Sequence, residues 1–160
     1  RGLHQGEDRL VMLMGRHHPL SGTVPSLDEY LAWPHLQVSG GGDKDSPVEQ
    51  VLAPLGLSRR WFARVPFFQA AVEVLLRTDC LMTTPAHIAW QLSREHALSF
   101  CDLPFATRVQ QYHLLWHQRH HLDPAHRWFR ELAYPFLRDH LQRTLGESRK
   151  QLGLKADPLR

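Results

Sequence analysis

A continuously apolar run close to the beginning of the chain, Leu10 to Met14, constrains the fold more than any other feature. The run ends at Gly15-Arg16-His17-His18-Pro19, a segment whose glycine and proline suit a strand that leaves its sheet. Five successive apolar residues offer no polar face to water, which is typical of a parallel strand covered on both sides by helices. We therefore expect a buried parallel strand here. The 42% hydrophobic content of the 160 residues is sufficient for the core that it needs.

Capping patterns predict where four helices begin: at Ser26, Ser46-Pro47-Val48-Glu49, Thr84-Pro85 and Asp123-Pro124. In each pattern a side-chain oxygen can accept a hydrogen bond from a backbone N–H of the first turn, and proline suits that turn. An apolar face formed by Phe68, Val72 and Leu75 predicts a further helix over residues 67–77. We expect the second helix to reach about Leu55 and end at Gly56. The last helix should kink at Pro135.

Strands are expected between these helices, at residues 35–39, 60–65, 80–83, 98–101 and 109–116. Parallel neighbours in a sheet need a crossover connection, and a helix is the usual crossover. Strands and helices that alternate at these lengths therefore predict an α/β fold with a mostly parallel sheet.

Catalytic signatures are missing from the sequence: there is no G-x-S-x-G, no phosphate-binding P-loop, no G-x-G-x-x-G and no cysteine beside a plausible base. We therefore expect a protein that is not an enzyme and that uses no cofactor. Cys80 and Cys101 lie in short apolar runs and do not have the spacing of metal ligands. In such runs a reduced thiol behaves as a small hydrophobic group. Two reduced cysteines are compatible with a cytoplasmic protein. The net charge of +3 comes from scattered basic residues, which argues against direct binding of nucleic acid by these residues.

Histidines are frequent, with twelve in the chain and five of them between residues 113 and 126. His117 and His121 would share one face if their segment were helical, at the spacing of helical zinc ligands. The segment is instead expected to run from a strand into a proline-containing cap, and it has no glutamate partner of the H-E-x-x-H type. We expect exposed or core-edge histidines and no metal site, with a histidine-rich metal-binding module as the alternative.

Several stretches in order along almost the whole chain resemble the effector-binding region of LysR-type transcriptional regulators, especially the branch that responds to small aromatic inducers. The stretches that carry the resemblance are Leu10 to Leu20, Ser26 to Leu31, Pro34 to Ser39, Leu52 to Arg60, Val65 to Phe68, Thr78 to Pro85, Leu114 to His117 and Asp123 to Leu132. The resemblance implies a periplasmic-binding-protein-like fold of type 2. In this fold two α/β lobes are joined by two crossing strands, and a small effector binds between them.

The resemblance also implies a division of the chain. Residues 1–18 would belong to lobe I, 19–108 to lobe II, 109–146 to the return strand and C-terminal helix of lobe I, and 147–160 to a polar, frayed tail. The family's winged helix-turn-helix and the opening part of lobe I have no counterpart in these residues, so contact with DNA is expected only through a missing N-terminal domain. The resemblance further implies a cytoplasmic homodimer or homotetramer with no membrane contact.

Ligands of open α/β sheets bind outside the carboxyl ends of the strands, where loops and helix N-termini offer free N–H groups. Three segments qualify, and they give the expected effector-binding residues: Ser39, Gly40, Gly41, Phe67, Phe68, Gln69, Thr83 and Pro85. Two adjacent phenylalanines cannot both face inward on one helix, so one ring is free to stack on an organic effector whose carboxylate binds backbone amides. The glycine segment could equally be a surface loop. A solute-binding module remains the other alternative function.

Overall fold

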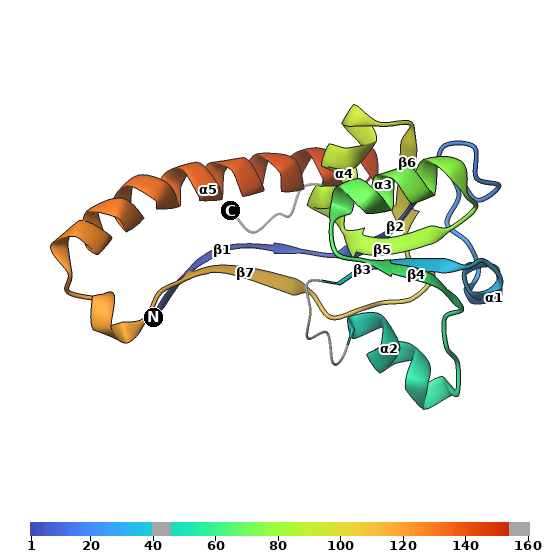
Figure 1. Ribbon diagram of the computed structural model, residues 1–160, viewed down its shortest axis with the longest axis horizontal. Helices are drawn as coiled ribbons and strands as arrows, with labels where there is room; N and C mark the ends of the chain where they lie inside the picture. Colours follow the sequence, from blue (N-terminus) through green and yellow to red (C-terminus); the bar gives the residue numbers. More distant parts are fainter. Residues whose placement is uncertain (40–45, 154–160) are drawn as a thin grey trace.

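The computed structural model describes residues 1–39 and 46–153 (Figure 1). Its elements are β1 (Gly2–Asp8), β2 (Leu10–Gly15), α1 (Leu27–Ala32), β3 (His35–Val38), α2 (Pro47–Leu52), the 3-10 turn η1 (Ala53–Leu55), β4 (Trp61–Val65), α3 (Phe68–Arg77), β5 (Leu81–Pro85), α4 (Ala86–Glu95), β6 (Leu98–Asp102), β7 (Gln110–Leu115), the 3-10 turn η2 (Gln118–His120) and α5 (Pro124–Gln151). The α/β alternation predicted from the sequence is confirmed. None of the helices in the described ranges has the length and hydropathy of a membrane-spanning segment.

Five strands form one sheet in the order β4-β3-β5-β2-β6. Strand β3 is parallel to both of its neighbours, whereas β2 is antiparallel to both β5 and β6. The prediction of a parallel strand over residues 10–14 is therefore wrong, and the sheet is mixed. A continuous apolar run indicates that a strand is buried on both faces of its sheet. It does not indicate whether the neighbouring strands run parallel or antiparallel to it.

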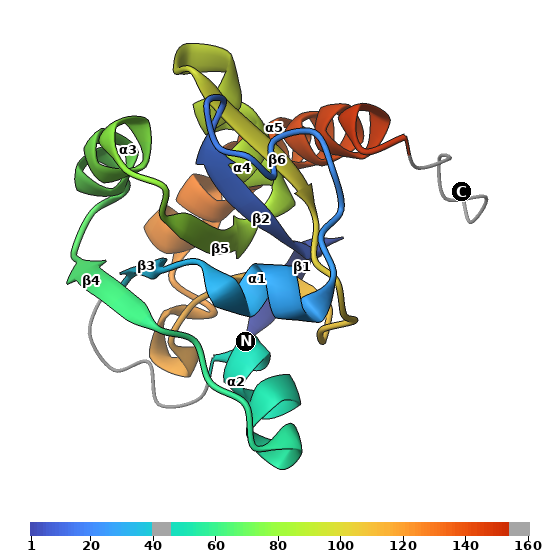
Figure 2. The ribbon, with the colours of Figure 1, turned by 90° about the vertical axis from the view of Figure 1, so that its right-hand side faces the viewer.

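Strand β2 supplies side chains to two cores on opposite faces of the sheet. Val11 and Leu13 pack with α3 and α4, while Met12 and Met14 pack with Tyr30 of α1, and all four strand residues are fully buried. Figure 2 shows α1 on one side of the sheet and α3 and α4 on the other. This alternation explains why the whole run is apolar.

The predicted cap at Ser26 is confirmed, because its side chain accepts from Glu29 N while Glu29 binds the Ser26 backbone N–H. Gly56 ends the second helical segment in the left-handed conformation, with φ of 69°, as expected for a glycine stop. The predicted cap at Thr84 is wrong. Thr84 lies inside β5 opposite Val11, and α4 begins at Ala86 without a side-chain cap. Pairing with β2 therefore prevails over the local capping preference.

Strand β1 was not expected from the sequence, and it pairs antiparallel with β7 in a separate two-stranded sheet. Figure 1 shows this ribbon and the long helix α5 extending together away from the five-stranded sheet. The ribbon joins the sheet at the step from β1 to β2. Residues 10–18, expected in the same lobe as the N-terminal residues, thus include a central strand of the sheet that also holds β3 to β6.

Helix α5 continues to Gln151, and Ser148 is fully buried, so the expected frayed tail from residue 147 does not begin there. The helix packs closely on β1, because a Cβ at Gly6 would lie 2.8 Å from Gln142 Nε2 and 3.2 Å from Leu145 Cδ1. Its N-terminal half carries an exposed apolar face: Trp128, Phe129, Leu132, Phe136 and Leu137. Apolar packing on β1 therefore anchors the C-terminal half of the helix.

We expect Leu145→Ala to lower the free energy of unfolding by about 2–4 kcal/mol, because it empties a site that is 3% exposed against β1. Leu137→Ala on the same helix is the matched control, since Leu137 is 51% exposed, and it should cost less than about 1 kcal/mol. Urea denaturation of the 160-residue chain measures both. Equal losses would contradict the anchored C-terminal half.

Candidate functional site

The carboxyl ends of β3, β4 and β5 lie at one edge of the sheet, because the three strands are parallel. Val38 is in register with Val65, and Ser39 N donates a 2.9 Å hydrogen bond to Val65 O. The three segments predicted to bind an effector follow or end these strands, so the fold brings them to the same edge. Gly40 and Gly41 fall outside the described residues.

The ribbon of β1 and β7 meets the sheet at this same edge. Leu10 at the start of β2 pairs with Pro85 at the end of β5, and Ala86 N donates to Arg9 O at 2.9 Å. The site residues therefore lie beside the point where the chain crosses out of the five-stranded sheet.

A buried carboxylate, that of Asp8, fixes this crossing point. Its oxygens accept from Arg9 N at 2.8 Å and from His87 N at 3.0 Å, and one of them lies 2.7 Å from His87 Nδ1. The ring of Tyr112 on β7 lies edge-on to His87, and burial together with the Asp8 charge raises the pKa of Tyr112 to about 12. Asp8 thus ties β1, β7 and the first turn of α4 together. No capping pattern or residue spacing in the sequence predicts this contact.

The start of α3 presents an exposed aromatic ring and uncapped amides. Phe67 is the N-cap residue, is 70% exposed and makes no side-chain capping bond, whereas Phe68 packs against the core. The expectation that the two rings cannot both face inward is thus confirmed. Gln69 is also exposed. A helix start without a side-chain cap leaves backbone N–H groups free to donate hydrogen bonds to an anionic ligand.

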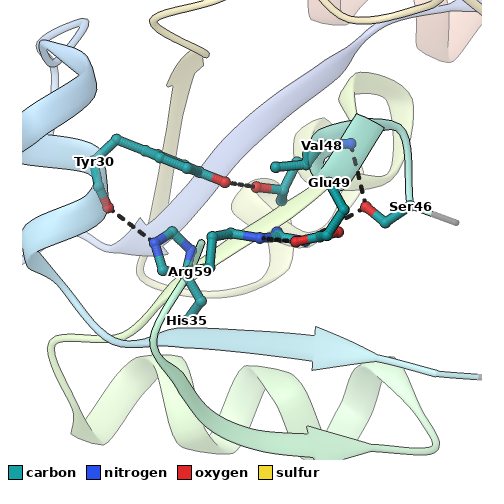
Figure 3. A network of polar contacts seen from close by, with 7 residues as sticks. Tyr30, His35, Ser46, Val48, Glu49 and Arg59 are labelled. Atoms are coloured by element: carbon teal, nitrogen blue, oxygen red, sulfur yellow. Dashed lines mark hydrogen bonds and ion pairs between the residues drawn. The ribbon is translucent and has the colours of Figure 1, made fainter. Parts of the chain in front are cut away.

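Thr83 is hydrogen-bonded to a member of a network of polar contacts that sequence reasoning missed. Its Oγ1 lies 2.7 Å from the hydroxyl of Tyr30, which comes from α1 and is fully buried. Arg59 belongs to the polar contacts drawn in Figure 3 and makes two hydrogen bonds of 2.8 and 2.7 Å to the carboxylate of Glu49 on α2. The guanidinium also stacks 4.4 Å above the Trp61 ring. No single motif marks this network, because its members come from separate segments.

His35 at the start of β3 belongs to the same buried region. Its Nε2 lies 2.9 Å from Tyr30 O, so this nitrogen carries the proton and donates. Burial lowers the pKa of His35 to about 4, which keeps the ring neutral at pH 7. Its Nδ1 has no hydrogen-bond partner within the described part of the chain. The charge in this region therefore resides on the Arg59 and Glu49 pair.

The histidines before α5 are held in a structural cluster. Arg130 donates to His120 O and His121 O at 3.0 Å each, and its guanidinium stacks 4.5 Å from the Trp116 ring. His120 and His126 stack on each other. In residues 1–39 and 46–153 no group of three His, Cys, Asp or Glu side chains could hold a metal ion, so the geometry lends no support to the metal-binding alternative.

Two concavities of the described surface contain none of the predicted residues. One, of about 560 Å³, lies beside the start of α5 and is lined by Trp116 and Tyr134 among others. The other, of about 640 Å³, lies at the amino ends of the strands and includes Pro34 and Cys80. The predicted residues are separate from both.

Comparison with protein families gives a match over most of the chain: a family model described as the LysR substrate binding domain matches residues 2–138. Among curated relatives, the HTH-type transcriptional activator NahR of Pseudomonas putida is 26% identical over 133 residues, which cover 83% of this chain and 44% of that protein. The chain thus spans less than half the length of this relative.

Solved structures share the fold. The regulatory domain of MexT, a transcriptional activator in Pseudomonas aeruginosa, is 29% identical with a TM-score of 0.73, and the match covers 85% of this chain and 67% of that one. A putative transcriptional regulator from Vibrio parahaemolyticus is 26% identical with a TM-score of 0.75, over 92% of this chain and 67% of that one.

The lowered pKa of His35 predicts a loss of stability in mild acid. Its folded pKa of about 4 lies below the usual 6.5, so the unfolded chain takes up the proton first as the pH falls. Because of this difference, the free energy of unfolding should fall by about 3 kcal/mol in total as the pH drops from about 6.5 through 4. We expect His35→Gln to flatten this part of the stability profile in urea denaturation.

His140→Gln, at an exposed position on α5, is the control and should leave the profile unchanged. His18 is also buried with a lowered pKa, caused chiefly by burial, so a residual slope should remain in the His35 variant. Identical profiles for the His35 variant and the unsubstituted protein would show that His35 is not buried as a neutral ring.

Proposed function

Because the chain belongs to the LysR substrate-binding domain family, we propose that it senses a small organic effector for a DNA-binding transcriptional regulator. The fold is of the periplasmic-binding-protein-like type that this family shares. The effector, a small aromatic acid in this proposal, binds beside the crossing strands. Its binding favours one arrangement of the lobes over another, which requires a different affinity for the two arrangements.

One observation carries the proposal: three chemically suitable segments converge on the edge of the sheet where the crossing ribbon joins it. Phe67 offers a face for an aromatic ring, and the uncapped start of α3 offers N–H donors for a carboxylate. The proposed contact residues are Ser39, Phe67, Phe68, Gln69, Thr83 and Pro85, together with Gly40 and Gly41, which lie outside the described ranges.

The division into lobes follows the strand pairing. We assign β2 to β6 with their helices to lobe II, and the ribbon and α5 to lobe I, with the boundary at the step from Asp8 to Arg9. Support comes from β2, which is a central strand of the lobe II sheet. The remaining boundary at about residue 108 rests on β7, which returns alongside β1.

The rest of the regulator is proposed from the family. DNA is contacted through a separate N-terminal domain, and the protein works in the cytoplasm as a homodimer or homotetramer. The exposed apolar face of α5, with Trp128 and Phe136, is proposed to pack against further lobe I residues. An exposed apolar surface of this kind is costly in water, which supports its being covered.

A thermal-shift screen of the full-length protein with benzoate and hydroxybenzoates tests the sensing function. A bound effector should raise the melting temperature, because a ligand that binds only the folded state stabilises it. Phe67→Ala should then weaken binding about 10-fold, since it removes a stacking surface worth about 1–1.5 kcal/mol.

Phe62→Ala is the matched control, because Phe62 is also an exposed phenylalanine but lies near the amino end of β4. It should leave the affinity unchanged. Equal effects of the two substitutions, or binding that neither variant weakens, would count against the proposed edge as the effector site.

A further inference from the structure

The segment that joins β7 to α5, residues 116–126, is rich in histidine, and we call it the histidine turn. It lies at the end of the ribbon that is remote from the five-stranded sheet (Figure 1). Arg130 of α5 holds the turn closed, because its guanidinium donates to His120 O and His121 O and stacks on the Trp116 ring. The way in which α5 is fastened to the end of β7 therefore depends on this turn.

Two histidine rings of the turn accept hydrogen bonds from arginine side chains. Arg119 Nε lies 2.7 Å from His120 Nε2. Arg130 Nη1 lies 2.7 Å from His126 Nδ1. A guanidinium can only donate, so both of these ring nitrogens carry no proton, and each ring is neutral in this arrangement.

Two further rings of the turn are held in the same way by other donors. The indole N–H of Trp116 donates to His121 Nδ1 at 3.4 Å. The backbone N–H of Arg119 donates to His117 Nδ1 at 3.2 Å. Neither donor can accept a hydrogen bond through its nitrogen, so these ring nitrogens are also unprotonated. The closed turn thus requires an acceptor nitrogen on four of its histidines.

A second proton on a histidine ring removes the acceptor that the turn uses. An imidazolium has an N–H group at both ring nitrogens and cannot accept a hydrogen bond. Protonation of His120 or His126 would also place a positive charge against a guanidinium, and like charges at such a distance repel. The two rings stack on each other with their centroids 5.2 Å apart, so a charge on both is less favourable still.

The other charged side chains around the turn do not reverse this effect. The hydrogen bond from His126 N lowers the pKa of Asp123, so this exposed carboxylate stays ionised and attracts a positive charge through solvent. Glu131 is paired with Arg127 at 2.8 Å. Arg1 reaches the turn from the start of the ribbon and adds a positive charge. Together with the two arginines bonded to the rings, these groups leave an excess of positive charge that opposes protonation.

Water has access to the turn through the cavity of about 560 Å³ beside the start of α5. His121 and Arg130 line this cavity. Tyr134 lines it as well, and its hydroxyl donates to His4 O, so the phenol is uncharged. Protons can therefore reach the turn from solvent without unfolding of the core.

From these contacts we propose that the histidine turn is a pH-sensitive switch, which fastens α5 to the end of β7 while its histidines are uncharged and opens in mild acid. Histidine is the side chain that changes its charge between about pH 5 and 8. The inference goes beyond the proposed function and needs no effector. Trp128 and Phe129 are exposed on the first turns of α5, so opening also displaces part of the apolar face of this helix.

Hydrogen–deuterium exchange of the full-length protein at about pH 7.5 and about pH 5.5 tests the switch. The amides that report on the closed turn are those of His120, His121 and Arg127, which donate to His117 O, Gln118 O and Asp123 O. After correction for the pH dependence of unprotected amides, their protection should fall about 10-fold at the lower pH. Each proton that must leave before the turn closes shifts the equilibrium by up to about 10-fold per pH unit.

The double variant His120→Gln with His126→Gln keeps an acceptor at both arginine contacts, because an amide oxygen accepts from a guanidinium but takes up no proton. It should keep most of its protection at about pH 5.5. His140→Gln, at an exposed position further along α5, is the matched control and should open like the unsubstituted protein. Equal protection of the unsubstituted protein at both pH values, or a loss that the double variant shares in full, would overturn the inference.

A second measurement locates the protons directly and does not depend on how well the double variant closes. In NMR of the protein labelled with ¹⁵N-histidine at about pH 7.5, His120 should carry its proton on Nδ1, and His126 should carry its proton on Nε2. The opposite tautomer at either residue, or an imidazolium at either one, would contradict the closed arrangement and overturn the inference.

Discussion

Burial of β2 on both faces is the constraint on which the rest of the structure depends. Its alternating side chains need helices on both sides of the sheet, and α1 on one side and α3 with α4 on the other meet that need. Its antiparallel pairing with β5 in turn sets Leu10 opposite Pro85. That register brings the crossing ribbon to the carboxyl ends of β3, β4 and β5. The candidate site is thus a consequence of how one apolar strand is covered.

Local signals in the sequence predicted most of the helix ends, because a cap involves residues only a few positions apart. Ser26 and Gly56 are examples. Thr84 shows the limit, since its pairing with Val11 depends on a segment more than 70 positions away in the chain. Strand β1 was missed for the same reason: its sequence is largely polar, and its partner β7 lies more than 100 residues further along.

Part of the candidate site could likewise be predicted from the sequence, and part could not. The rule that ligands meet the carboxyl ends of parallel strands identified segments such as Phe67 and Thr83 without coordinates. The residues behind them, Tyr30, Arg59 and Glu49, escaped detection because no spacing links them in the sequence. A buried tyrosine in an amphipathic helix looks like an ordinary core residue until the partner of its hydroxyl is known.

The bulge in β1 has a mechanical consequence. The register shifts between His4 and Gly6, and Gly6 lies so close to α5 that a Cβ there would collide with Gln142. Ribbon and helix therefore pack together as one arm, and the bulge adds local twist to the ribbon. The base of this arm is held by the Asp8 carboxylate, which accepts from His87 N at the start of α4, and by the packing of α5 against α4. The direction in which the far tip of the arm points is therefore set by the contacts at its base (Figure 1).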